Sequence, residues 1–120
     1  MDDDAPAVTS HSDDRGGLVA VELPRVDFEV RRVFVVAGSN GRTDRGNHVI
    51  PCEQLMVLVH GSVEINVGSD ADHLAPAVLL DVPGMSLSLP AGEYVRYRLR
   101  DPSSVVMVLA EQVYRRPSPS

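Results

Sequence analysis

Short apolar runs separated by turn-forming residues dominate this chain of 120 residues. Gly, Pro, Asn and Asp interrupt the runs about every 8–12 residues, which is typical of an all-β sandwich or barrel. No window shows the 3.6-residue apolar stripe of an amphipathic helix. The pattern predicts about eight to ten strands, a number that suits a double-sheet jelly roll.

Alternation of apolar and polar residues predicts which face each strand buries. In the segment from Val95 to Leu99, Tyr97 and its odd-numbered neighbours should point inward and the arginines outward. The longest predicted strand, residues 26–36, would place all its even-numbered residues on one face, Arg32 among them. Other strands are expected at residues 18–23, 55–59, 63–67, 77–82, 85–89 and 104–110.

Composition divides the chain into a folded middle and two polar ends. Residues 1–14 hold five Asp with Ser, Thr and Pro, which predicts a flexible acidic arm. Residues 115–120 predict a C-terminal tail. A single domain of residues 15–114 lies between them, long enough to bury a core.

Charge and cysteine content exclude several classes of function. The formal net charge of −6 argues against a nucleic-acid partner, and no apolar run approaches the roughly 20 residues of a membrane span. The acidic N-terminus is unlike a signal peptide. A single Cys52 excludes an internal disulfide and fits either a reducing compartment or a protein indifferent to redox state, and we expect a cytoplasmic location. All 11 basic residues are Arg, which indicates a GC-rich genome such as that of an actinobacterium.

Two stretches, residues 45–61 and 84–99, have the spacing of the two motifs of the cupins, and this resemblance implies a jelly roll. A metal-binding cupin has His, His and Glu in the first motif, where this chain has His48, Ile50 and Gln54. It has His in the second motif, where this chain has Val95. A transition metal needs three or four converging N, O or S donors. We therefore expect a cavity without metal or cofactor.

Three further segments resemble one family of cupins, the WxcM-like sugar-nucleotide 3,4-ketoisomerases, and the likeness covers about residues 15–114. The segments are Arg15–Leu18 followed by Glu22, Arg31–Phe34, and Arg45–His48. The resemblance implies a homodimer, often with exchanged N-terminal strands, that binds a dTDP-4-keto-6-deoxyhexose. It also implies a metal-free transfer of the keto group between C4 and C3 through an enediol, carried by a pair of His and a Tyr.

The proton carriers of that family are only partly present in this sequence. The first His matches His48, but the second falls at Ile50 and the strand Tyr falls at Phe34 or Val35. Tyr94 stands where the family commonly has Trp. These replacements make the predicted cavity more apolar.

Three functions follow as hypotheses. The first is a metal-independent isomerase or cyclase of natural-product biosynthesis, in which a ketoisomerase-like jelly roll binds an apolar, polyketide-like intermediate and promotes its isomerisation, cyclisation or cycloaddition. The second is a dTDP-4-keto-6-deoxyhexose 3,4-ketoisomerase of deoxysugar biosynthesis with His48 as base. The third is a ligand-binding cupin without chemistry. A ketoisomerase is expected to gather Arg15, Arg32 or Arg45 around a diphosphate, whereas a cyclase needs no such cluster.

The candidate catalytic residues are His48, Gln54 and Tyr97. The pKa of an unperturbed His lies near the operating pH of a general base, an amide can hold a carbonyl or hydroxyl, and a Tyr can donate a proton. The competing interpretation is structural, with each group satisfied inside the protein. The predicted substrate-binding residues are Arg32, Phe34, Arg45, Asn47, Ile50, Met56, Leu58, Tyr94, Val95, Leu99 and Met107. For most of the apolar ones an ordinary core position is the alternative, and Arg32 could instead pair with Glu22 or Glu53.

Overall fold

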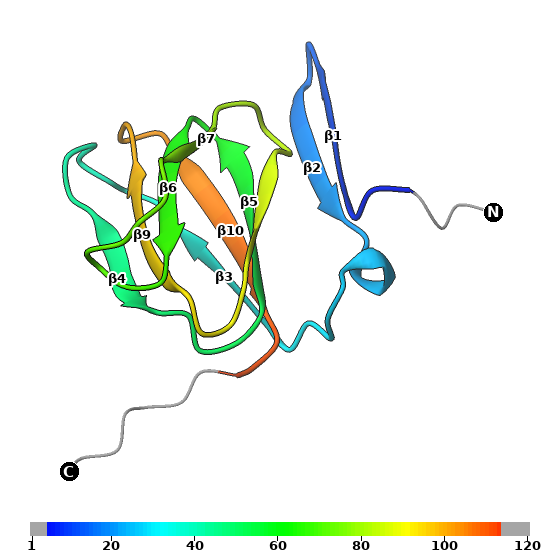
Figure 1. Cartoon of the computed structure of the whole chain (residues 1–120). Coiled ribbons are helices and arrows are strands. Elements are labelled where there is room, and N and C mark those ends of the chain that lie inside the picture. The colour runs from blue at the N-terminus through cyan, green and yellow to red at the C-terminus, as the bar shows by residue number, and fades with distance from the viewer. Residues whose placement is uncertain (1–4, 114–120) are drawn as a thin grey trace.

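A computed structural model describes residues 5–113 and shows two facing antiparallel sheets with a separate hairpin beside them (Figure 1). The elements are β1 (Val8–Asp13), β2 (Gly16–Val21), the 3₁₀ helix η1 (Leu23–Arg25), β3 (Arg32–Val36), β4 (Arg45–Val49), β5 (Gln54–His60), β6 (Val63–Gly68), β7 (Val78–Leu80), β8 (Ser86–Leu89), β9 (Tyr94–Leu99) and β10 (Val105–Ala110). None of the described residues forms a helix with the length and hydrophobicity needed to cross a membrane.

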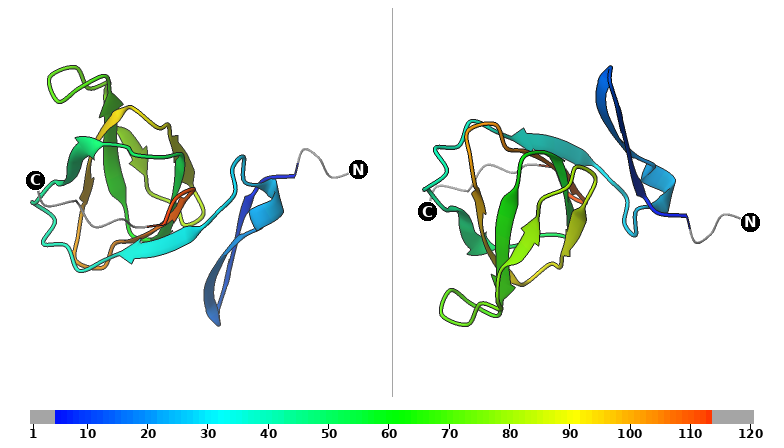
Figure 2. Two further views of the ribbon diagram at one scale, coloured as in Figure 1. Left: turned by 90° about the horizontal axis from the view of Figure 1, so that it is seen from below. Right: turned by 90° about the horizontal axis from the view of Figure 1, so that it is seen from above.

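The two large sheets have the orders β3-β10-β5-β8 and β4-β9-β6-β7, and every pairing within them is antiparallel. Seen from either end, the sheets curve around one interior, and the β1–β2 hairpin lies outside it (Figure 2). The predicted all-β jelly roll is therefore confirmed.

The main core lies between the two sheets. Its members come from both sheets and include Met56 and Val108 on one side and Val95, Tyr97 and Leu99 on the other. In β9 the buried residues alternate with half-buried arginines, as the sequence pattern predicts. Alternation thus fixes which side chains face the interior.

A second apolar cluster covers the outer face of the β3-β10-β5-β8 sheet. Leu55, Val57 and Leu109 alternate along their strands with core residues, so they point away from the interior. The N-terminal segment packs over them, and Met107 contributes from β10. Both faces of this sheet are therefore apolar, which is typical of a sheet that is covered on both sides.

Two predictions about the N-terminal part are wrong. The segment 26–36 is not one strand with one buried face, because only Arg32–Val36 forms β3. Val26, Phe28 and Val30 instead pack on the outer cluster. The arm predicted for residues 1–14 is also not entirely irregular, since Val8–Asp13 forms β1 and pairs with β2. Residues 1–4 of this arm and the tail 115–120 lie outside the described residues.

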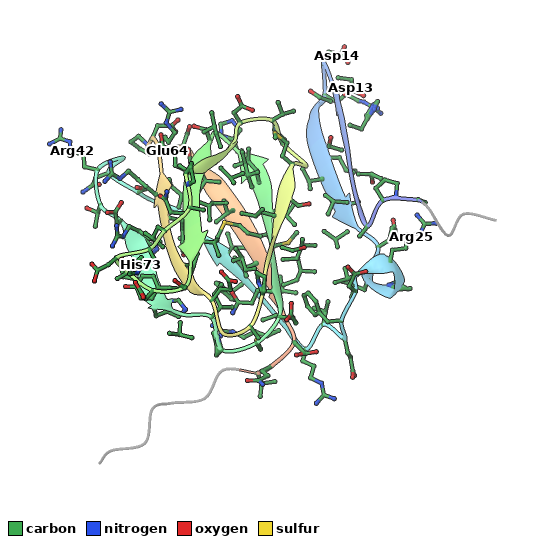
Figure 3. All side chains as sticks on the ribbon, in the orientation of Figure 1. Asp13, Asp14, Arg25, Arg42, Glu64 and His73 are labelled. Carbon is green, nitrogen blue, oxygen red and sulfur yellow. The ribbon has the colours of Figure 1, made fainter. Side chains whose placement is uncertain are left out.

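At the hairpin turn, Asp13 pairs with Arg15, and its carboxylate also lies 3.3 Å from Nε2 of His11. The Arg15 guanidinium donates to the Asp13 carboxylate, as does the Arg15 amide, and these hydrogen bonds hold the pKa of Asp13 below its usual value. Asp13 and Asp14 lie at the tip of the hairpin, far from the sheets (Figure 3). Arg15 therefore does not join Arg32 or Arg45.

The turn between β5 and β6 packs closely against Ser104 at Gly61. Gly61 has φ of +79°, and a Cβ there would lie 2.7 Å from the Ser104 Cα. Ser104 is fully buried, and its hydroxyl accepts a hydrogen bond from the Ser62 amide at 3.0 Å. We expect Gly61→Ala to lower the free energy of unfolding by about 3 kcal/mol, since backbone strain and overpacking add.

Gly38→Ala is the matched control for this substitution. Gly38 also has φ of +79°, but nothing lies within 4 Å of the position of its Cβ. Urea unfolding should therefore show a loss of only about 1 kcal/mol, from backbone strain alone. Equal losses for the two variants would contradict the claim that the contact of Gly61 with Ser104 constrains the turn.

Candidate functional site

A cavity of about 860 Å³ opens between the two sheets at one end of the jelly roll. Its floor is apolar, formed by the nearly fully buried Met56, Leu89, Val95 and Val108. Polar side chains lie around it and come from β3, β4, β5 and β9: Arg32, Arg45, His48, Gln54 and Tyr97. The volume lies in the range of small-molecule sites, and so does the combination of an apolar floor with few polar groups.

His48 lies on β4 opposite Val95 of β9. Its side chain is exposed and lines the cavity, so a ligand bound there would meet an accessible imidazole. Arg45 lies on the same strand opposite Tyr97 and also lines the cavity. The two basic side chains of β4 therefore face one space.

Arg32 reaches the cavity from the facing sheet. Its Cζ lies 4.4 Å from the centroid of the Phe34 ring, two residues along β3. A guanidinium over an aromatic face is attracted by the ring electrons. Phe34 therefore restrains the Arg32 guanidinium at the cavity wall, where both residues lie. Glu53, which the sequence offers as a partner for Arg32, accepts a hydrogen bond from the Ala91 amide at 3.2 Å.

Gln54 and Tyr97 are the other two polar candidates. Gln54 is half-buried at the start of β5, beside Leu89 and Ala110 of the neighbouring strands. Tyr97 is only 8% exposed and belongs to the core, yet part of its side chain contacts the cavity. Their positions allow an amide and a phenol to reach the same ligand as His48.

Six residues predicted to bind substrate do not line this cavity: Asn47, Ile50, Leu58, Tyr94, Leu99 and Met107. Ile50, Leu58 and Leu99 are at most 1% exposed and belong to the core between the sheets. Met107 packs in the outer cluster on the opposite face of its sheet. Tyr94 and Asn47 belong to the outer side of β4 and β9, where Asn47 accepts a hydrogen bond from Arg96.

Several residues that line the cavity are not among those predicted from the sequence. Leu89 and Val108 could have been found, because both alternate with outward residues in predicted strands. Asp44 and Cys52 offered no pattern, since both lie in irregular segments. Asp44 is paired with the Arg98 guanidinium at 2.9 Å. Within residues 5–113, no three His, Cys, Asp or Glu side chains are grouped as a metal site would require.

The two sheets enclose a cavity with polar side chains around it, and this jelly roll is the fold of the cupin class. The chain belongs to the family described as WxcM-like, C-terminal (FdtA), whose model matches residues 2–118. A comparison with curated protein sequences finds no significant match.

Solved structures of sugar ketoisomerases have the same fold. A 3,4-ketoisomerase from Helicobacter canadensis is 24% identical with a TM-score of 0.76, and the match covers 91% of this chain and 82% of that protein. The QdtA 3,4-ketoisomerase from Thermoanaerobacterium thermosaccharolyticum, in complex with TDP, is 22% identical with a TM-score of 0.77 and coverages of 91% and 80%. The WlaRB TDP-quinovose 3,4-ketoisomerase from Campylobacter jejuni is 23% identical with a TM-score of 0.75 and coverages of 91% and 84%. At these identities the likeness establishes the fold.

Proposed function

We propose that this chain is an isomerase that moves the keto group of a dTDP-linked 4-keto-6-deoxyhexose between C4 and C3. One observation carries the proposal: Arg32 and Arg45, from opposite sheets, line the same cavity as His48. Guanidinium groups match phosphate oxygens in geometry and charge. The two arginines thus provide a diphosphate-binding pair beside a candidate base. The family and the similar TDP-bound QdtA support this assignment.

The reaction needs only proton transfers. His48 as a neutral imidazole removes the proton from C3, and the electron pair forms an enediolate with the C4 carbonyl. A proton then passes from the 3-hydroxyl to the C4 oxygen, and return of a proton to C4 leaves the carbonyl at C3. Substrate and product are therefore isomers, and no oxidant or reductant is consumed. Tyr97, or a water beside it, returns this proton, and Gln54 holds a sugar hydroxyl with its amide.

The apolar floor favours a second candidate function. Met56, Leu89, Val95 and Val108 present hydrocarbon to a ligand, and Phe34 extends this surface up the wall. A polyketide-like intermediate could be folded on such a surface into a reactive conformer, which lowers a cyclisation barrier without a proton relay. In that case the arginines would contribute little to binding.

Ligand-induced thermal stabilisation tests the proposal. We expect dTDP, at concentrations far above its Kd, to raise the melting temperature by about 5 °C, because a ligand bound only by the folded state stabilises it by mass action. Thymidine, which lacks the diphosphate, should raise it much less. Stabilisation by an apolar acyl thioester of N-acetylcysteamine but not by dTDP would refute the sugar-nucleotide assignment and favour the second candidate.

We also propose that the chain forms a homodimer through the outer face of β3. Val33 and Val35 are 52% and 61% exposed there, on an edge strand beside the half-buried Met107. The β1–β2 hairpin packs on the same outer face through Val8, Val19 and Val21 and leaves Leu18 58% exposed. A second copy that covers these residues would bury apolar area and protect the open strand edge.

A single charged substitution tests the dimer. We expect Val35→Glu to convert the dimer to a monomer in light scattering after size-exclusion chromatography, because a buried unpaired carboxylate opposes association. Val82→Glu is the control, since Val82 is similarly exposed, at 57%, in the loop after β7. A dimer that persists in the Val35 variant would place the interface elsewhere.

A further inference from the structure

We infer that Asn47 and Arg96 are positioning residues that hold Arg45 and His48 on the same face of β4. Neither residue lines the cavity. They act from the outer surface by stabilising a β-bulge in the Arg45–His48 segment. The assignment of chemistry to His48 rests on the proposed function, whereas the positioning itself follows from the backbone.

The bulge decides where the two basic side chains point. Residues three apart in a regular strand lie on opposite faces. In β4, however, Arg45 is opposite Tyr97 and His48 is opposite Val95, and the register shifts between Gly46 and His48. Both partners face the core, so the extra residue Asn47 brings Arg45 and His48 to the inner face together.

The backbone of the bulge requires unusual residues. Gly46 and Asn47 have φ of +78° and +55°, and Asn47 is the one non-glycine residue with positive φ between residues 5 and 113. Most L-residues are strained in this region, but Asn tolerates it. Gly46 also packs closely, since a Cβ there would lie 3.0 Å from the Val95 carbonyl oxygen and 3.3 Å from Cδ1 of Tyr97.

Arg96 holds the bulge from outside. Its Nε donates to Oδ1 of Asn47 at 2.8 Å, from the strand position directly opposite Gly46. The bulge therefore lies between the Tyr97 ring on the inner side and the Arg96 side chain on the outer side. Loss of this hydrogen bond removes the side-chain contact that favours the bulged pairing over a regular one, so the segment should populate a straighter strand in which His48 leaves the cavity.

Four variants test this inference. Asn47→Gly removes the acceptor without adding backbone strain, and Arg96→Ala removes the donor. Asn47→Asp keeps an acceptor oxygen and tolerates the same backbone, so it should behave like the wild type. Arg100→Ala is the control, because Arg100 pairs with Glu64 at 3.3 Å and lies beyond the register in which β4 pairs with β9.

The readout is the nuclear Overhauser effect between the His48 ring and the Val95 methyl groups. We expect Asn47→Gly and Arg96→Ala to lose most of its intensity, and Asn47→Asp and Arg100→Ala to keep it. If the wild type turns over the keto-sugar, the first two variants should lower kcat about tenfold with less than about a threefold change in KM, because a misplaced base affects chemistry more than binding.

The two proposals can fail separately. Wild-type intensity in both Asn47→Gly and Arg96→Ala would overturn the positioning role, whether or not the protein acts on sugars. Absence of turnover in the wild type would overturn the proposed function, while the nuclear Overhauser effects would still decide the role of the bulge.

Discussion

Replacement of His48 by Gln is expected to lower turnover of the dTDP-linked keto-sugar by about 10²–10⁴-fold, the usual contribution of a positioned acid–base group. Gln keeps a polar side chain of similar reach but cannot accept the C3 proton at neutral pH. Because the side chain already faces solvent at the cavity, the variant should fold normally. The measurement is kcat from the appearance of the 3-keto isomer in NMR spectra, with KM determined in parallel.

His73→Gln is the matched control for the base. His73 is exposed in the loop after β6, where its Nδ1 lies 2.7 Å from the Asp70 carboxylate, and it does not line the cavity. Turnover should be unchanged in this variant. A loss of less than about tenfold in His48→Gln would argue against a base at this position. A reaction that depends mainly on the shape of the cavity would give that result.

The sequence pattern predicts the strands of the C-terminal half of the chain correctly. From β5 to β10, each predicted strand overlaps an observed one, because short runs of Val, Leu and Ile are separated by clear turn residues. Alternation also assigns Val95 and Tyr97 to the interior correctly. The paired cupin spacing adds the topology, which alternation alone does not contain.

The predictions were wrong in the N-terminal half of the chain, where the face that a segment buries depends on its packing against distant parts of the chain. Val26 and Val36 lie on opposite sides of one sheet, since the chain crosses its edge between η1 and β3. Nothing in the alternation of residues 26–36 marks this crossing. β1 was missed because its side chains are mostly polar, and its strand is defined by pairing with β2. Met107 was assigned to the wrong face because β10 is apolar on both faces.

Within the candidate site, sequence spacing located the correct motif but not the direction of every side chain. His48 and Ile50 were expected to share a cavity, yet Ile50 is 1% exposed in the core. Asn47 was expected to bind ligand, but the bulge turns it to the outer face. A bulge inverts the parity of every residue before it, so no argument from alternation can anticipate its effect.

Replacement of the cavity arginines, Arg32 and Arg45, should have the second large effect, a loss of affinity for dTDP. We expect Arg32→Gln and Arg45→Gln each to weaken dTDP binding by about tenfold or more, because a hydrogen bond to a charged group contributes about 1.5–3 kcal/mol. Because both guanidinium groups would contact one diphosphate, their effects are coupled, and the double variant should bind dTDP more weakly than either single variant without reaching a fixed product of the two losses. Calorimetric titration at two salt concentrations measures this. Wild-type affinity should fall with added salt, and the double variant should respond less, since screening acts on the charges that were removed.

Arg42→Gln separates a local contact from a general effect of charge. Arg42 is exposed in the loop before β4, does not line the cavity, and projects outward (Figure 3). Arg42→Gln removes the same unit charge from a residue that does not line the cavity. Long-range attraction of dTDP should therefore fall in all three single variants, while a direct contact is lost only in Arg32→Gln and Arg45→Gln. Affinity for dTDP that is unchanged in Arg32→Gln and Arg45→Gln would remove the basis of the diphosphate site. The apolar floor would then be the better guide to the ligand.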